Sequence, residues 1–119
     1  MIRKNEDRKI VIMESTGNAV GKVTFKNIIN KDEFCNSGSL FSEITIAPKS
    51  MVKYHEHHNE FEVYYIIKGE GIYNDNNETN TVVKAGDITY CPSNCGHSFE
   101  NTSDTEDLVF IALINKCFN

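Results

Sequence analysis

The chain has 119 residues, 39% of them hydrophobic, and a formal net charge of −5 at pH 7. This length allows one domain with a substantial core and is short for two. No run of about 20 apolar residues could span a membrane, and the N-terminal segment lacks the apolar stretch of a signal peptide. The only arginines are Arg3 and Arg8, so the chain has no basic stripe for nucleic-acid phosphates. We therefore expect a cytoplasmic protein that binds neither membranes nor nucleic acid.

Short segments rich in Val, Ile, Thr, Tyr and Phe follow one another along the chain, and this composition favours β-strands. They lie at residues 10–13, 20–29, 41–47, 62–67, 71–74, 79–83, 87–90 and 108–114. Turn residues separate them, as in the Asn- and Asp-rich run at 74–78, and residues 30–39 form a loop with room for a single helical turn. This pattern is typical of an antiparallel sandwich or barrel. We predict a single all-β domain.

The stretch HEHHNEFE, residues 55–62, concentrates residue types that bind metals. In a strand, side chains at i and i+2 share a face, so His55 and His57 would project together. A turn at residues 58–60 would bring Glu62 back to the same point from the next strand. Two imidazole nitrogens and one carboxylate oxygen would then converge.

The one histidine outside this stretch is His97, which follows a strand and a turn containing Pro92 and Gly96. If the sheet curls so that this segment neighbours the first, His97 completes a set of three histidines and one glutamate. Mixed nitrogen and oxygen ligation suits a divalent transition metal, such as Mn, Fe, Ni, Co, Cu or Zn, rather than Ca or Mg. Four protein ligands in an octahedral site leave two positions for a substrate, water or dioxygen.

The two segments resemble the two motifs of the cupin superfamily. The first motif is His-x-His, three or four residues, Glu, six residues and Gly, which matches His55, His57, Glu62 and Gly69. The second is Gly, five residues, Pro-x-Gly, two residues, His, three residues and Asn, which matches the run from Gly86 through Pro92 and His97 to Asn101. The resemblance covers roughly residues 48–101, nearly half of the chain.

The resemblance implies an antiparallel double-stranded β-helix, or jelly-roll barrel, with residues 1–119 as one cupin domain and a metal-binding core at about 40–114. It also implies a homodimer. Two positions depart from the motifs, because Lys49 and Asn94 stand where glycine is usual. Asparagine is common at positive φ, so we expect Asn94 to keep the turn. Neither departure affects a ligand position.

Other interpretations of the same residues are open. The histidines could form a solvated loop, and Cys91, Cys95 and His97 could bind zinc, although no second Cys/His pair lies at the usual spacing. A His-Glu-x-x-His metalloprotease is excluded, because Asn59 stands at the second histidine position. The four cysteines, Cys35, Cys91, Cys95 and Cys117, are expected to be thiols.

Three residues are candidates for a ligand pocket by strand parity. Lys53 shares the parity of His55 and His57, Tyr64 that of Glu62, and Phe99 that of His97. For Lys53, extension of the side chain to solvent is the alternative. Glu56, His58 and Glu60 are expected at the surface, and the sequence does not determine which face of strand 41–47 points inward.

The site defines a mechanism class rather than a substrate. The resemblance implies a superfamily with oxygenases, decarboxylases, isomerases, lyases and binding proteins. We expect a metal-dependent enzyme of the oxygenase or isomerase/lyase type, acting on a small oxygen-rich chelating molecule. The alternative is a non-catalytic module that binds or senses a metal and a small ligand. Few arginines make a sugar phosphate a poor substrate.

Overall fold

The computed structural model describes residues 1–117, which form a protein built almost entirely of β-strands. The strands are β1 (Ile10–Glu14), β2 (Ala19–Val20), β3 (Lys22–Ile29), β4 (Gly38–Ile46), β5 (Met51–His57), β6 (Glu60–Lys68), β7 (Glu70–Asp75), β8 (Thr79–Lys84), β9 (Ile88–Cys91), β10 (Cys95–Glu100) and β11 (Leu108–Lys116). Two short 3₁₀ helices, η1 (Asn5–Asp7) and η2 (Lys31–Phe34), precede β1 and β4. Among the described residues, no helix has the length and apolar character needed to cross a membrane.

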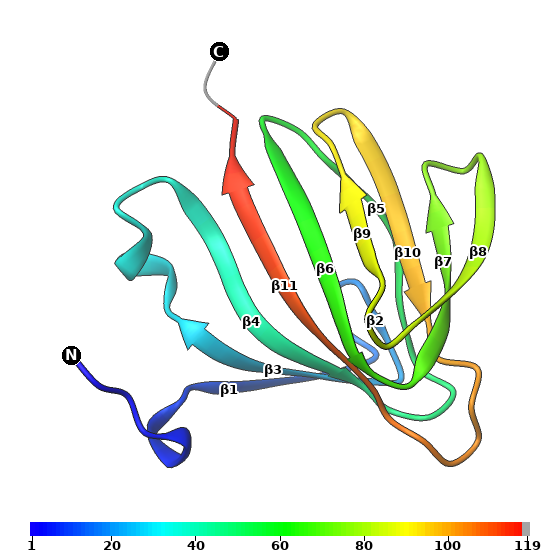
Figure 1. Ribbon diagram of the computed structural model, residues 1–119, viewed down its shortest axis with the longest axis horizontal. Coiled ribbons are helices and arrows are strands. Elements are labelled where there is room, and N and C mark those ends of the chain that lie inside the picture. Colours follow the sequence, from blue (N-terminus) through cyan, green and yellow to red (C-terminus); the bar gives the residue numbers. More distant parts are fainter. Residues whose placement is uncertain (118–119) are drawn as a thin grey trace.

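The strands form two sheets that face each other as the walls of a barrel (Figure 1). The six-stranded sheet has the order β1-β3-β4-β11-β6-β9, and the five-stranded sheet has the order β2-β5-β10-β7-β8. Neighbouring strands pair antiparallel in both sheets. The all-β jelly-roll prediction is confirmed.

The core lies between the sheets, where alternate residues of each strand point inward. Its fully buried side chains include Ile46, Ile66, Phe99, Leu108 and Phe110. Strand β4 buries Ser42, Ile44 and Ile46 and directs Glu43 outward, where Arg8 binds its carboxylate at 3.1 Å. The structure therefore determines which face of this strand points inward, a question that the sequence leaves open.

The expected strand at residues 20–29 is divided in two by Gly21. This glycine has a φ of +73°, and a Cβ atom built on it would lie 2.2 Å from the Ser50 hydroxyl oxygen. The chain bends there, so β2 joins the five-stranded sheet and β3 joins the six-stranded sheet. The expectation of one continuous strand was wrong, because local composition does not reveal a change of sheet.

The segment that contains His97 is strand β10, and it begins before Gly96, which was expected in the preceding turn. Gly96 belongs to β10, and the turn before it is formed by Pro92, Ser93 and Asn94. Asn94 has a φ of +70° and Lys49 a φ of +60°. Both residues therefore adopt the left-handed backbone conformation that glycine usually provides at these two motif positions. The expectation for Asn94 is confirmed.

Candidate metal centre

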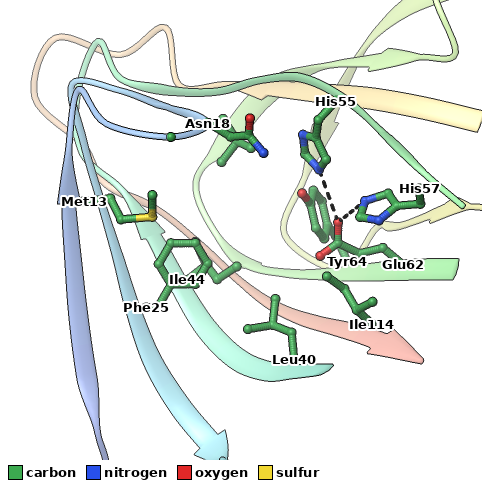
Figure 2. Close-up of a pocket in the computed structure, with 12 residues that line it drawn as sticks. Met13, Asn18, Phe25, Leu40, Ile44, His55, His57, Glu62, Tyr64 and Ile114 are labelled. Carbon is green, nitrogen blue, oxygen red and sulfur yellow. Dashed lines mark ion pairs between the residues drawn. The ribbon is translucent and has the colours of Figure 1, made fainter. Parts of the chain in front are cut away.

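Four side chains from three strands converge on one point. One ligand atom from each of His55, His57, Glu62 and His97 lies within 4.8 Å of every other, and we call this set the histidine–glutamate cluster. Strand parity places His55 and His57 together on β5, and β6 returns Glu62 beside them (Figure 2). Strand β10 pairs with β5 so that His97 lies opposite His55.

The spacing of the cluster fits a single metal ion. Glu62 Oε1 lies 2.9 Å from His97 Nε2, 3.0 Å from His57 Nε2 and 3.9 Å from His55 Nε2. The His97 Nε2 atom is 3.1 Å from that of His57 and 3.2 Å from that of His55. Ligands about 2.1 Å from an octahedral metal are about 3.0 Å apart when adjacent and about 4.2 Å apart when opposite.

The second nitrogen of each imidazole ring is held by a partner outside the cluster. His55 Nδ1 lies 2.9 Å from the Lys53 carbonyl oxygen, and a carbonyl can only accept, so this nitrogen carries the proton. His57 Nδ1 lies 2.5 Å from the Glu60 carboxylate, and His97 Nδ1 lies 2.7 Å from the Tyr73 hydroxyl. An Nδ1–H that donates outward leaves the Nε2 lone pair of the neutral ring directed at the centre, which is the arrangement that metal binding requires.

Glu60 and Tyr73 are the residues that the sequence analysis missed. Glu60 was expected at the surface, although its position three residues after His57, across a tight turn, is a local signal that could have identified it. Tyr73 has no such signal. It reaches His97 only because β7 pairs with β10, which places Tyr73 opposite Phe99.

The buried carboxylate of Glu62 remains ionised. Its side chain is 3% exposed, and burial alone would raise its pKa. The three neighbouring imidazoles, of which His57 and His97 lie at hydrogen-bond distance, outweigh burial and hold the pKa of Glu62 well below its usual range. The centre therefore contains one permanent negative charge, which favours a cation.

The histidines of the cluster differ in their affinity for protons. Burial lowers the pKa of His97 despite the neighbouring Glu62, so His97 is neutral near pH 7. Burial also acts to lower the pKa of His57, but hydrogen bonds with Glu62 and Glu60 outweigh it and raise that pKa. Because only a neutral imidazole binds a metal, a metal must compete with a proton for His57.

A cavity of about 340 Å³ adjoins the cluster and is lined in part by His55, His57, Glu62 and Tyr64. Tyr64 is 2% exposed and stacks on the His97 ring with the ring centroids 5.0 Å apart. Of the three pocket candidates from the sequence, only Tyr64 lines this cavity.

The other two pocket candidates lie elsewhere. Phe99 is fully buried in the core against Phe110. Lys53 is exposed. The pairing of β5 with β10 changes register between His97 and Phe99, so Val52 and His55 both face inward although they are three residues apart. This β-bulge breaks the parity on which the prediction for Lys53 depended.

The cysteines take no part in the cluster. Cys91 is buried, and burial together with the nearby Cys95 and Glu62 raises the pKa of its thiol to about 12. A thiol in that state is a poor zinc ligand, because the thiolate is the binding form. The structure therefore favours the histidine–glutamate cluster over the cysteine-based alternative.

Comparison with known proteins gives consistent matches. The profile of the family Cupin_2, described as "Cupin domain", matches residues 42–114. An "Oxalate-binding protein" of Thermotoga maritima is 40% identical over 94 residues, which cover 79% of this chain and 76% of that protein.

Solved structures match over nearly the whole chain. A "predicted oxalate decarboxylase" of Thermotoga maritima has a TM-score of 0.88 and 33% identity, and the alignment covers 98% of this chain and 100% of that one. The polyketide cyclase RemF of Streptomyces resistomycificus has a TM-score of 0.76 over 99% of this chain and 81% of its own, with 16% identity. At that identity the likeness concerns the fold alone.

Proposed function

The chain belongs to the cupin family, and from this premise we propose that it holds one divalent transition metal at the histidine–glutamate cluster and binds a small oxygen-rich chelating ligand there. The observation that carries the proposal is the convergence of three Nε2 atoms and one carboxylate oxygen at the spacing of metal ligands. The bound metal would supply a Lewis acid that polarises a carboxylate or carbonyl oxygen. The name of the oxalate-binding relative supports a small carboxylate as the ligand.

Catalysis on such a ligand is the second candidate function. The observation that favours it is the position of Tyr64 and Glu62, which present a hydroxyl and a carboxylate to the cavity beside the cluster. The Tyr64 hydroxyl can donate a hydrogen bond to a ligand oxygen, and the Glu62 carboxylate can accept a proton from a ligand once it has left the metal. An oxygenase and an isomerase or lyase remain the reaction types that we propose in this case.

Metal content tests the proposal directly. We expect untagged protein to contain about one equivalent of a transition metal by elemental analysis, and His57→Ala to contain almost none. His58→Ala is the matched control, because His58 lies next in the chain, is exposed and bonds Asn94 and Glu56 rather than the cluster. Circular dichroism would show that each variant is folded.

Two outcomes would contradict the proposal. One is a wild-type protein without metal, even after incubation with Mn, Fe, Ni and Zn salts. The other is equal metal content in the wild type and in His57→Ala.

A second experiment separates binding from catalysis. Oxalate is added to metal-loaded protein under air, with calorimetry and an oxalate assay in parallel. Binding without consumption indicates a binding module, and consumption indicates an enzyme.

We also propose that the protein forms a homodimer through the outer face of the six-stranded sheet. Outward residues of β6, β9 and β11 form an apolar surface, the outer patch, which consists of Phe61, Val63, Tyr65, Ile67, Ile88, Tyr90, Val109, Ile111 and Leu113. Register makes the patch continuous, since Tyr65 lies between Ile88 and Ile111.

A second copy of the chain is the occupant that suits the outer patch. The side chains of the outer patch carry no formal charge, whereas the chain as a whole carries −5. Contact between the patches of two copies therefore avoids placing the acidic groups of one copy against those of the other. Tyr65, Ile67, Ile88 and Tyr90 are 51%, 47%, 62% and 53% exposed. Contiguous exposure of this kind marks interaction surfaces.

A cytoplasmic location is a further part of the proposal. It is supported by Cys35, Cys91, Cys95 and Cys117, all of which are free thiols in the structure. Free thiols are usual in reducing compartments.

A further inference from the structure

The cavity beside the cluster has a polar end and an apolar end. Figure 2 shows His55, His57 and Glu62 on one side and Leu40, Ile44, Phe25 and Met13 on the opposite side. Val52 and Ile114 extend the apolar wall. The cavity volume is about 340 Å³, and one water occupies about 30 Å³ of liquid. The cavity therefore has room for roughly ten waters, more than the six heavy atoms of a two-carbon dicarboxylate would fill.

The cavity offers no cation for a second carboxylate. Among residues 1–117, which the structure describes, no lysine or arginine lines it. Arg3 bonds Glu33, Arg8 bonds Glu43, and the side chain of Lys53 is exposed. A divalent metal and the Glu62 carboxylate together carry one positive charge. A monoanionic ligand neutralises it, whereas a dianion leaves one uncompensated negative charge beside apolar walls, which is costly.

Two uncharged polar groups complete the polar end. The Tyr64 hydroxyl lies next to Glu62, and the Asn18 amide lies near His55 at the edge of the cavity (Figure 2). Both groups can donate a hydrogen bond to a ligand oxygen without adding charge. The polar end therefore suits a compact oxygen-bearing head group, and the remaining volume suits hydrocarbon.

We propose that the cavity selects a chelating monoanion with an apolar body, of the class of 2-oxo or 2-hydroxy monocarboxylates with a branched aliphatic or aromatic side chain, over oxalate itself. The inference rests on the proposed metal-dependent ligand binding and specifies its ligand class. The carboxylate and the neighbouring oxygen chelate the metal, and the side chain packs against Phe25, Leu40 and Ile44. Specificity then arises from the apolar wall rather than from ion pairing.

The test is a ligand series measured by calorimetry on nickel-loaded protein. The ligands are oxalate, pyruvate, 4-methyl-2-oxopentanoate and phenylpyruvate. Burial of the added hydrocarbon should strengthen binding of the two larger oxo acids at least about tenfold relative to pyruvate, and both should bind more tightly than oxalate. Binding is the readout, so the test does not depend on turnover.

A pair of variants locates the apolar contact. Leu40→Thr should weaken binding of 4-methyl-2-oxopentanoate about fivefold and leave pyruvate unchanged, because Leu40 contacts only the hydrocarbon body. Val82→Thr is the control, an exchange of an apolar side chain for threonine at a position that is 61% exposed and lies in the other sheet, outside the outer patch. It should leave both affinities unchanged.

The outcomes separate this inference from the function on which it rests. Tight binding of oxalate with equal affinities across the oxo acids would overturn the inference and leave the proposed function in place. Failure of every chelator, oxalate included, on protein that holds nickel would remove ligand binding itself. An equal effect of Leu40→Thr on pyruvate and on the larger acid would show that Leu40 acts through the fold.

Discussion

Glu60 controls the electrostatics of one cluster residue without belonging to the cluster. Its carboxylate lies 2.5 Å from Nδ1 of His57, while Glu62 lies 3.0 Å from Nε2 of the same ring. Each carboxylate stabilises the protonated ring, and together they raise the pKa of His57 above its usual value of 6.5. The charge on Glu60 also makes the neutral ring a stronger metal ligand.

Glu60→Gln should therefore weaken metal binding about tenfold when affinities are compared at a pH above the raised pKa of His57, where no proton competes for the ring. Glutamine keeps the shape of the side chain and an acceptor oxygen but removes the charge. The measurement is nickel affinity by competition with a chelator. Glu56→Gln is the control, since Glu56 is 56% exposed and contacts His58 at 3.4 Å, outside the cluster. Equal affinities for the two variants would contradict the role of Glu60.

The same variant predicts a shift in the pH dependence. In the wild type, a metal must displace a proton from His57 at any pH below its raised pKa, so affinity falls as the pH drops through that value. Removing the Glu60 charge lowers the pKa, so the fall should begin at a lower pH. Nickel titrations between pH 8 and pH 5 would show it. Superimposable profiles would show that Glu60 does not set this pKa.

At the scale of elements, two tight turns hold the cluster strands in register. One turn leads into β5 through Lys49, and the other leads into β10 through Asn94. Both residues have positive φ, at +60° and +70°. Asparagine tolerates this conformation better than lysine does, because its short polar side chain can bond locally. The strain is therefore concentrated at Lys49.

Lys49→Gly should raise the free energy of unfolding by up to about 1 kcal/mol, because glycine adopts positive φ without a clash but loses more entropy on folding. The substitution also removes the ion pair between Lys49 and Asp104, whose charged atoms lie 3.2 Å apart. Because the two side chains are 64% and 81% exposed, this pair contributes little to the free energy of unfolding. Urea denaturation at fixed metal concentration measures the change. Lys49→Ala removes the same charge but keeps the Cβ atom, and an equal gain in that variant would exclude backbone strain as the cause.

At the scale of the whole molecule, the outer patch makes the oligomeric state predictable. We expect sedimentation of the wild type at twice the 13.5 kDa mass of one chain at tens of micromolar protein. Ile88→Glu should yield monomers, because a buried, unpaired charge would lie in the interface. Val82→Glu is the matched control, since Val82 is 61% exposed, close to the 62% of Ile88, but lies in the other sheet. A monomeric wild type would exclude the dimer.

Much of the site could be predicted from local sequence. Strand parity brings His55 and His57 together, and one tight turn returns Glu62 to them within a few residues, so the spacing alone suffices. The all-β fold follows from strand-forming segments separated by Asn, Asp and Gly turns. Local rules did not reveal the break at Gly21, because a change of sheet depends on the close contact of that residue with Ser50.

The sequence by itself determined three ligand candidates within one hairpin, the position of a fourth by resemblance, and the class of fold. Tertiary structure alone decided that β10 pairs with β5, which places His97 against His57 across 40 residues of sequence. It also decided that Glu60 and Tyr73 hold the rings and that a β-bulge turns Lys53 away from the cavity. The physical reason is that side-chain period is a local property of a strand, whereas register, bulges and cavity walls arise from pairing and packing between segments far apart in the chain.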